Sequence, residues 1–251
     1  STQGFMCGAP RVRMKRLRVR SMMMPARVDD EGSGLWWRLI GYGRSARDSS
    51  TCRQRATGSG RTSLKIADDT VDEIKAMAKG AHFFFPHART VIHIGAEEGR
   101  AAKMDEQGNV EDFAINEKCA AGAGAFIEGM ARALDVAVEE MGPLCLQSDR
   151  QIPMNAQCVI FAESDVVNLI HANTEKPEIS KAIHDAIASR IASIIRRIGI
   201  NEDIVMLGGV GYNLGFIDAL RRELKIDTIY IPDEPEYGAA VGAAILAAET
   251  A

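Results

Sequence analysis

The most regular pattern of apolar residues lies between Glu178 and Ile198, where isoleucines recur every three or four positions. This is the period of an α-helix, so the pattern predicts a long helix that buries one stripe of side chains in the core. The predicted stripe comprises Ile183, Ile187, Ile191, Ile194 and Ile198.

Shorter helices are predicted elsewhere by the same period and by their boundary residues. Phe126, Met130 and Leu134 form one face of a helix that begins after Cys119 and runs to about Val138. Gly142-Pro143 is expected to break the helical pattern there. The other predicted helices cover residues 66–80, the stretch after Cys158, 213–224 and 236–248.

Between these helices lie short runs rich in β-branched residues, which are typical of strands. Strands alternating with helices indicate an α/β sheet. The predicted strands are residues 89–95, 100–104 and 110–115, the last two joined by a turn at 105–109, followed by 202–207 and 228–231.

Length and composition describe an ordinary globular chain. It has 251 residues, of which 46% are hydrophobic and 25% charged, enough for one large domain or two modest lobes. The small-residue run 239–248 is too short to span a bilayer. We find no signal-peptide pattern, and the five cysteines are odd in number and irregularly spaced. These features predict reduced thiols, a cytoplasmic location and no membrane partner.

Charge divides the chain sharply. Residues 1–65 carry a formal charge of +10, whereas residues 66–251 carry −14. Neither a helical nor a strand period is sustained over residues 1–55, so we interpret this stretch as an aberrant or disordered basic leader. A basic arm that binds nucleic acid is the less favoured alternative.

Three glycine-containing segments could approach a nucleotide closely, because small residues expose backbone N–H groups. They contain Gly95 and Ala96; Gly122 and Gly124; and Gly208, Gly209 and Asn213. Taken singly, each also fits a plain turn between elements. Together, in this order on an α/β pattern, they predict a nucleotide site, with the carboxylates of Glu97 and Glu98 as candidates to position Mg²⁺ or water.

Cys119 and Cys158 each precede a helical pattern, which suggests a redox or metal centre. A pair of buried structural thiols is the alternative. Two cysteines cannot complete a four-thiolate site, so a metal centre would need a second subunit. Cys145 is expected to be a packing or exposed thiol. His93 is expected in the core or near the site, and His171 and His184 on helix surfaces.

The cysteine and glycine motifs give a specific resemblance. Residues 116–124 (NEKCAAGAG), 158–164 (CVIFAES), 207–210 (LGGV) and 237–244 (YGAAVGAA) resemble the activator ATPases of 2-hydroxyacyl-CoA dehydratases and of ATP-dependent benzoyl-CoA reductase, the BadF/BadG/BcrA/BcrD type. The segment 94–100 (IGAEEGR) is most similar to the D-type subunit of the reductase. The resemblance covers about residues 57–251, so residues 56–251 are interpreted as the activase ATPase domain.

The resemblance implies an actin/Hsp70/sugar-kinase-like (ribonuclease H-like) fold. It also implies ATP with Mg²⁺, and a [4Fe-4S] cluster held between two subunits by Cys119, Cys158 and the equivalent pair of a companion activase subunit. The implied function is ATP-driven electron transfer, from a ferredoxin to the ring-reducing subunits that dearomatise benzoyl-CoA. A 2-hydroxyacyl-CoA dehydratase activator and a structural nucleotide-binding subunit without a cluster are the alternatives.

The chain departs from the family pattern in three places. Ser59 stands where a family Thr-Gly-Tyr-Gly-Arg segment has Tyr. No Gly-x-Asp-x-Gly-Ser/Thr phosphate loop precedes residue 56, so mostly the second lobe of the ATPase is expected. His93 stands where the family's second phosphate motif usually has Asp, which removes an expected Mg²⁺-associated carboxylate.

Overall fold

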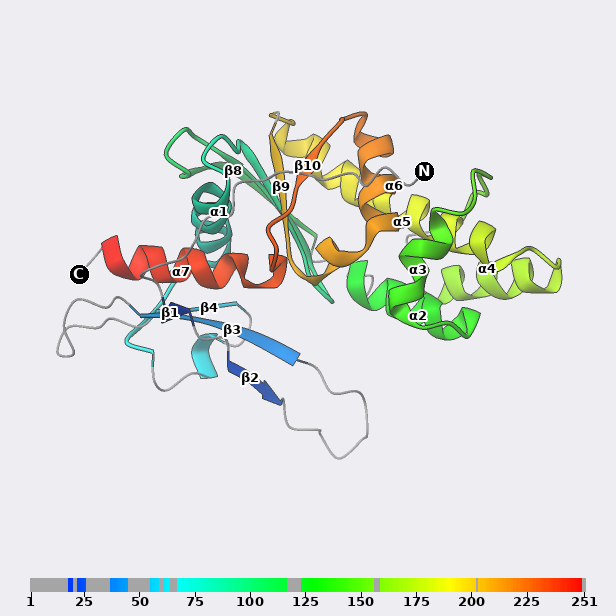
Figure 1. Ribbon diagram of the computed structural model, residues 1–251, viewed down its shortest axis with the longest axis horizontal. Helices are drawn as coiled ribbons and strands as arrows, with labels where there is room; N and C mark the ends of the chain where they lie inside the picture. The colour runs from blue at the N-terminus through cyan, green and yellow to red at the C-terminus, as the bar shows by residue number, and fades with distance from the viewer. Residues whose placement is uncertain are drawn as a thin grey trace, which may run out of the picture.

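The computed structural model describes residues 55–58, 61–63, 67–116, 123–155, 159–201 and 203–249, and the backbone of three strands within residues 18–44. A five-stranded mixed sheet forms its centre, in the order β10-β9-β6-β7-β8 (Figure 1). β9 lies parallel to β6 and β10, whereas β7 is antiparallel to β6 and β8. The strands are β6 (Thr90–Ile94), β7 (Gly99–Met104), β8 (Val110–Asn116), β9 (Ile204–Leu207) and β10 (Ile229–Tyr230).

Helices cover both faces of this sheet. α1 (Glu73–Phe84) and α7 (Gly238–Glu249) pack on one face, and α5 (Lys176–Ile198) and α6 (Leu214–Leu224) on the other. A second sheet lies beside α7 (Figure 1). It contains β1 (Arg18–Val19), β2 (Met22–Pro25), β3 (Trp37–Arg44), β4 (Arg55–Thr57) and β5 (Asp69–Thr70). The boundary predicted at residue 55 stays a prediction.

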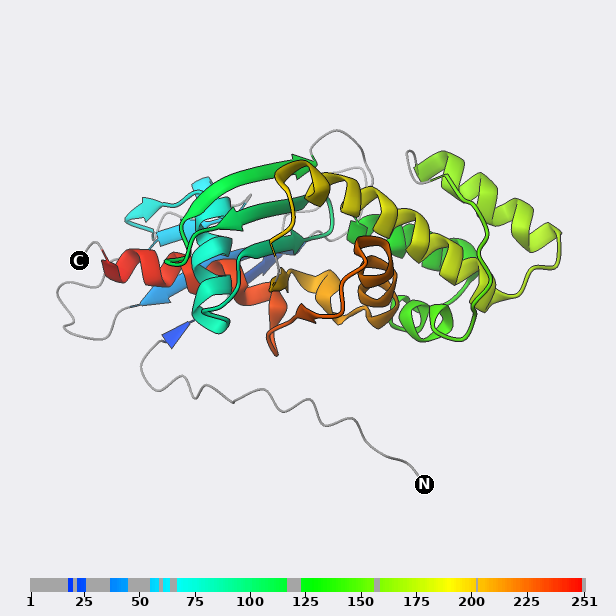
Figure 2. The same cartoon turned by 90° about the horizontal axis from the view of Figure 1, so that it is seen from above.

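A group of helices extends from one end of the central sheet (Figures 1 and 2). It comprises α2 (Ala123–Leu134), α3 (Val138–Cys145) and α4 (Val159–His171). α2 packs against both α3 and α4, and α2 and α3 pack against α5. The described residues also form three short 3₁₀ helices: η1 (Arg61–Ser63), η2 (Gly209–Tyr212) and η3 (Pro235–Tyr237). In the described part of the chain, every helix is too short or too polar to cross a bilayer.

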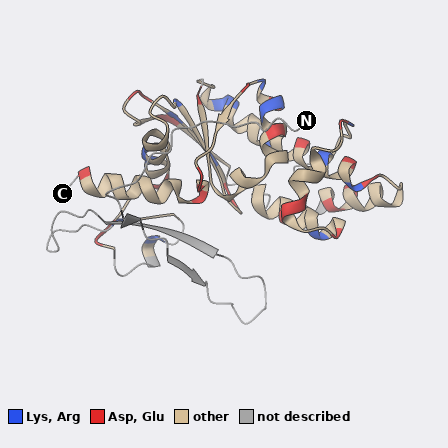
Figure 3. Cartoon of the chain, in the orientation of Figure 1, with Lys and Arg blue, Asp and Glu red and all other residues tan. Residues whose placement is uncertain are grey.

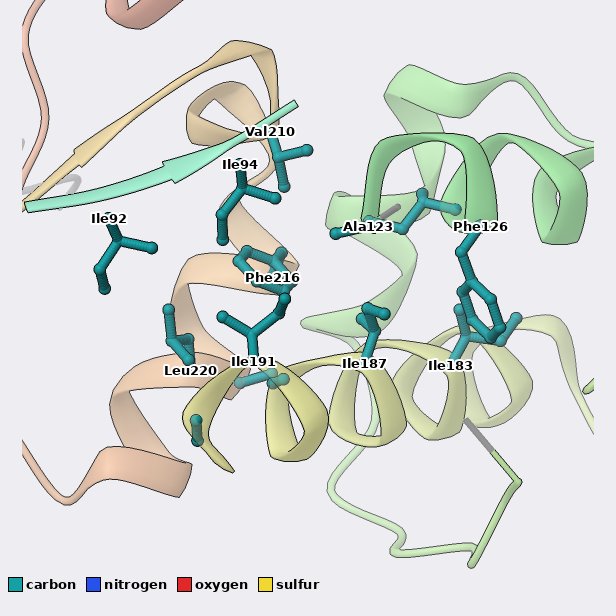
Figure 4. Close-up of a cluster of buried hydrophobic side chains, with 14 of the residues drawn as sticks. Ile92, Ile94, Ala123, Phe126, Ile183, Ile187, Ile191, Val210, Phe216 and Leu220 are labelled. Carbon is teal, nitrogen blue, oxygen red and sulfur yellow. The ribbon is translucent and has the colours of Figure 1, made fainter. Parts of the chain in front are cut away.

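The isoleucine stripe of α5 forms the main core, as its period predicts. All five isoleucines are buried in one cluster with Ile92 and Ile94 of β6 and Phe216 of α6. In Figure 4, Ile191 lies near Phe216, and Ile183 lies beside Phe126 of α2. The predicted face of α2 is buried in the same cluster. Burial of this many large side chains is the main term that holds α5 across the sheet.

Several predicted helix boundaries are wrong. α1 continues past Gly80 to Phe84, and the helix expected to reach Val138 ends at Leu134, before α3 begins separately. α1 starts at Glu73 because the carboxylate of Asp72 caps it, accepting from the amides of Ile74 (2.9 Å) and Lys75 (3.3 Å). α3 continues through Gly142-Pro143 instead of breaking there. Pro143 lacks the amide that would have bonded to the carbonyl oxygen of Glu139, so the helix loses one backbone hydrogen bond there, and it ends two residues later.

Helices α1 and α7 cross at backbone contact. A Cβ atom on Gly80 would lie 1.9 Å from the carbonyl oxygen of Gly238, and one on Gly242 would lie 1.7 Å from that of Ala76. No side chain can flex away from such a clash, because both partners are backbone atoms. The crossing therefore requires glycine on both helices.

We predict that Gly242→Ala lowers the free energy of unfolding by about 1–3 kcal/mol or more, because α1 and α7 must separate. Urea denaturation measures this. Gly129→Ala in α2 is the matched control: its nearest neighbour would be an Arg132 nitrogen at 3.8 Å, so the higher helix propensity of alanine should leave stability equal or greater. Equal stability of both variants would contradict the proposed crossing.

Candidate nucleotide site

A cavity of about 600 Å³ lies where the central sheet meets the helical group. Four parts of the chain form its wall: the β6–β7 turn, α2, α3, and η2 with the start of α6. The lining residues are Gly95, Ala96, Gly124, Ile127, Glu128, Val138, Glu139, Gly142, Pro143, Gly209, Val210, Tyr212, Asn213 and Leu214. The three segments predicted from sequence thus meet at one cavity, to which Gly95, Ala96, Gly124, Gly209 and Asn213 contribute directly.

Gly208 does not line the cavity, but its conformation allows the neighbouring backbone to form the cavity wall. It has φ of +92°, and a Cβ atom there would lie 2.2 Å from the carbonyl oxygen of Ile94. Only glycine tolerates both conditions. The chain therefore turns directly beneath the end of β6, which brings Gly209 to the cavity wall beside the β6–β7 turn.

The first turn of α2 docks on the β6–β7 turn through its backbone. The amide of Gly124 donates to Gly95 (3.1 Å) and that of Ala125 to Ala96 (2.9 Å). A Cβ atom on Gly124 would lie 2.9 Å from the Cα of Ala96, so the docking needs glycine. These two amides bond to protein carbonyls and are therefore not free to bind an anion. The rest of the small-residue loop, residues 119–122, lies outside the described residues, so its predicted contact with an anion stays a prediction.

Asn213 joins the cavity to a buried polar cluster. Its side-chain oxygen Oδ1 accepts from the amide of Phe216 (3.0 Å), which caps α6, and lies 3.2 Å from Nε2 of His184. The other ring nitrogen, Nδ1, lies 2.7 Å from the carbonyl oxygen of Ser180. Ser180 also donates from its hydroxyl to Met141 of α3 (2.7 Å). One cluster thus ties α3, α5 and α6 together behind the cavity.

The surface position expected for His184 is wrong, since its side chain is fully buried. Burial lowers its pKa, and the contacts with Ser180 and Asn213 oppose that shift. Helical spacing could have revealed the burial, because His184 directly follows Ile183 and precedes Ile187 by three positions, on the face of the stripe. His171 is exposed, as expected.

The charged residues that line the cavity are both acidic. Glu128 of α2 and Glu139 of α3 are exposed, and the described residues that line the cavity include no Lys or Arg. Figure 3 colours the acidic residues of the helical group red. A polyphosphate would therefore rely on backbone dipoles and a bound cation for charge balance, and Mg²⁺ fits that requirement.

The two predicted acidic residues lie outside the cavity wall. Glu97 is exposed. Glu98 pairs with Arg100, which also donates to Glu73 of α1 (2.8 Å). Burial raises the pKa of Glu73, and Arg100 opposes this shift. The roles proposed for Glu97 and Glu98 stay predictions.

Cys119, Gly122 and Cys158 lie outside the described residues. The chain around them is described: α2 begins at Ala123 and α4 at Val159, the residue after Cys158, and the two helices pack together. Cys145 is buried with its Sγ 3.9 Å from the carbonyl oxygen of Gly215, and burial raises its pKa to about 11. It is therefore a packed, protonated thiol at neutral pH, in agreement with its expected role.

We predict that Asn213→Ala lowers the free energy of unfolding by about 1–3 kcal/mol, because α6 loses its cap and His184 loses a partner. Thermal or urea denaturation measures the loss. Asn168→Ala, at an exposed position of α4, should stay within about 0.5 kcal/mol of wild type. If both variants match wild type, Asn213 does not hold this cluster together.

His93 should make stability depend on pH. Burial, and then the charge of Arg100, lowers its pKa from 6.5 to about 4. Above pH 6.5 the side chain is neutral in both the folded and the unfolded chain, so it does not lower the free energy of unfolding there. As the pH falls toward 4, the unfolded chain takes up a proton that the folded chain resists, so the free energy of unfolding decreases by up to about 3 kcal/mol.

Urea denaturation between pH 7.5 and 4.5 measures this decrease. His93→Gln should flatten the dependence, whereas His171→Gln, at an exposed site, should not change it. An unchanged slope in His93→Gln would show that other groups cause the acid sensitivity.

Residues 40–247 match the BadF/BadG/BcrA/BcrD ATPase family. The chain is 40% identical over 196 residues to the activator of lactoyl-CoA dehydratase from Anaerotignum propionicum, covering 78% of this chain and 75% of that protein. It is 35% identical over 174 residues to the D-type subunit of benzoyl-CoA reductase from Thauera aromatica, covering 67% and 61%.

Among solved structures, an activator of the 2-hydroxyisocaproyl-CoA dehydratase from Clostridium difficile with bound ADPNP superimposes with a TM-score of 0.74. Its sequence is 36% identical, and the match covers 78% of this chain and 73% of that one. The likeness confirms the actin/Hsp70/sugar-kinase-like fold class expected from sequence. The chain belongs to the BadF/BadG/BcrA/BcrD ATPase family.

Proposed function

We propose that the chain is the activating ATPase of a 2-hydroxyacyl-CoA dehydratase. The observation that carries the proposal is the similarity to dehydratase activators, which extends over 195–196 residues, against 174 for the D-type reductase subunit from Thauera aromatica. The first interpretation of the sequence, a benzoyl-CoA reductase subunit, therefore becomes the second candidate. Both candidate functions use ATP-driven electron transfer, and they differ in the enzyme that receives the electron.

ATP with Mg²⁺ is the proposed ligand of the cavity. The turn at Gly95 and Ala96 and the backbone at Gly209 supply its uncharged wall, and Asn213 supplies a fixed amide. Mg²⁺ would offset the repulsion between the phosphates and the carboxylates of Glu128 and Glu139. These are the residues that would bind and orient the nucleotide.

A [4Fe-4S] cluster shared by two copies of the chain, or by the chain and a companion subunit, is the proposed redox centre. Thiolates are the ligands that such clusters take, and Cys119 and Cys158 supply half of the four. α2 and α4 begin within four residues of these cysteines and pack together, which supports their convergence. When bound, the cluster would carry single electrons from a ferredoxin-type donor to the client enzyme.

We predict about four irons and four acid-labile sulfides per two chains after purification without oxygen. Cys119→Ser and Cys158→Ser should each lose most of the iron and the EPR signal of the reduced cluster. Cys145→Ala is the control and should retain both, because that buried thiol packs against Gly215. Absence of iron from wild type would leave a nucleotide-binding subunit without a cluster.

The client is identified by reconstitution. The reduced chain with ATP should restore turnover of a 2-hydroxyacyl-CoA dehydratase component and give little turnover of the ring-reducing subunits with benzoyl-CoA. The opposite preference would establish the second candidate. Iron measurement and reconstitution are separate, so failure of one client assignment leaves the cluster assignment intact.

A further inference from the structure

Tyr212 is an exposed aromatic residue at the cavity. It ends η2 with 56% of its surface exposed, and Leu214, two positions later, is 60% exposed. Both line the cavity. Large apolar groups held open to solvent at a cavity are typical of ligand-binding surfaces, where a ligand would cover them.

The ring of Tyr212 is held in place by η3. Its hydroxyl donates to a carboxylate oxygen of Glu236 at 2.6 Å. The two short helices are joined by their backbone as well, because the amide of Gly208 donates to Pro235 (2.8 Å). A Cβ atom on Gly211 would lie 3.1 Å from the Pro235 ring, so η2 and η3 pack closely. A fixed ring loses less entropy on binding than a mobile one.

The charges around Tyr212 determine which part of a nucleotide can lie there. Although the residue as a whole is largely exposed, desolvation of its hydroxyl group raises the pKa of Tyr212. The hydrogen bond to Glu236 and then the charges of Glu236 and Glu234 act in the same direction. Tyr212 is therefore neutral at physiological pH, and its surroundings are negative. Phosphate groups are repelled from such a rim, whereas an uncharged aromatic base is not.

We infer that Tyr212, held by Glu236, stacks on the base of the bound nucleotide and positions it in this site. The inference rests on the proposed nucleotide-binding function of the cavity. Stacking needs a flat aromatic ring exposed at the cavity, and Tyr212 is a largely exposed aromatic residue of the cavity lining. It also explains why the ring is fixed at its hydroxyl end, which leaves the rest of the ring available to the ligand.

The test separates the base from the phosphates by comparing two ligands, Mg²⁺-ATP and Mg²⁺ with inorganic triphosphate, by calorimetric titration of the full chain. Tyr212→Ala should raise the Kd for ATP about five- to 150-fold, the range expected for loss of base–aromatic stacking. The Kd for triphosphate should stay within about twofold. Tyr212→Phe keeps the ring but loses the Glu236 hydrogen bond, and should show a smaller loss.

Phe113→Ala is the matched control, because Phe113 is 52% exposed on β8 and does not line the cavity. Its ATP affinity should equal that of wild type. If wild type binds ATP and Tyr212→Ala binds it equally well, or loses ATP and triphosphate affinity in parallel, the inference is overturned while the proposed function stands. If wild type binds neither ligand, the proposed nucleotide site fails and the inference fails with it.

Discussion

The site depends on three segments of backbone that approach more closely than any side chain permits. The backbone of Gly208 packs directly against the carbonyl group of Ile94, and that of Gly124 packs against the backbone of Ala96. The two hydrogen bonds from the start of α2 to the β6–β7 turn form because that approach is possible. Larger residues would separate the sheet from the helical group, and the cavity between them would lose its wall. Glycine is therefore needed here for space, and at Gly208 for its positive φ as well.

The same contact makes α2 a direct connection between two parts of the proposed machinery. Gly124, Ile127 and Glu128 of α2 line the cavity, and the helix begins four residues after Cys119. Behind the cavity, the cluster of Asn213, His184 and Ser180 binds α6, α5 and α3 to one another. A shift of α2 relative to the sheet would therefore change the nucleotide site and the chain that leads to the cysteine together.

Much of this arrangement could be predicted from the sequence because period and glycine position are local signals. The isoleucine stripe located α5, and the glycine segments located the cavity wall. Predictions failed where the position of a side chain depends on residues that are distant in sequence and close only in the folded structure. Helical spacing alone did not show that Asn213 comes to lie beside His184, and the ion pair of Arg100 with Glu73 joins β7 to α1 across 27 positions of sequence. The hydrogen bonds from the amides of Gly124 and Ala125 to Gly95 and Ala96 likewise form only when α2 packs against the β6–β7 turn, so the sequence alone does not reveal them.

The acidic cavity wall constrains how ATP could act in such a protein. Hydrolysis can do work only if two conformations bind nucleotide with different affinity. Glu128 on α2 and Glu139 on α3 face the cavity from the helical group, whereas Gly95 and Ala96 belong to the sheet. Loss of the γ-phosphate, or of the cation that accompanies it, would change the electrostatic balance across that boundary. The helices that carry the carboxylates would then have a physical reason to move relative to the sheet, and α2 would carry that movement toward Cys119.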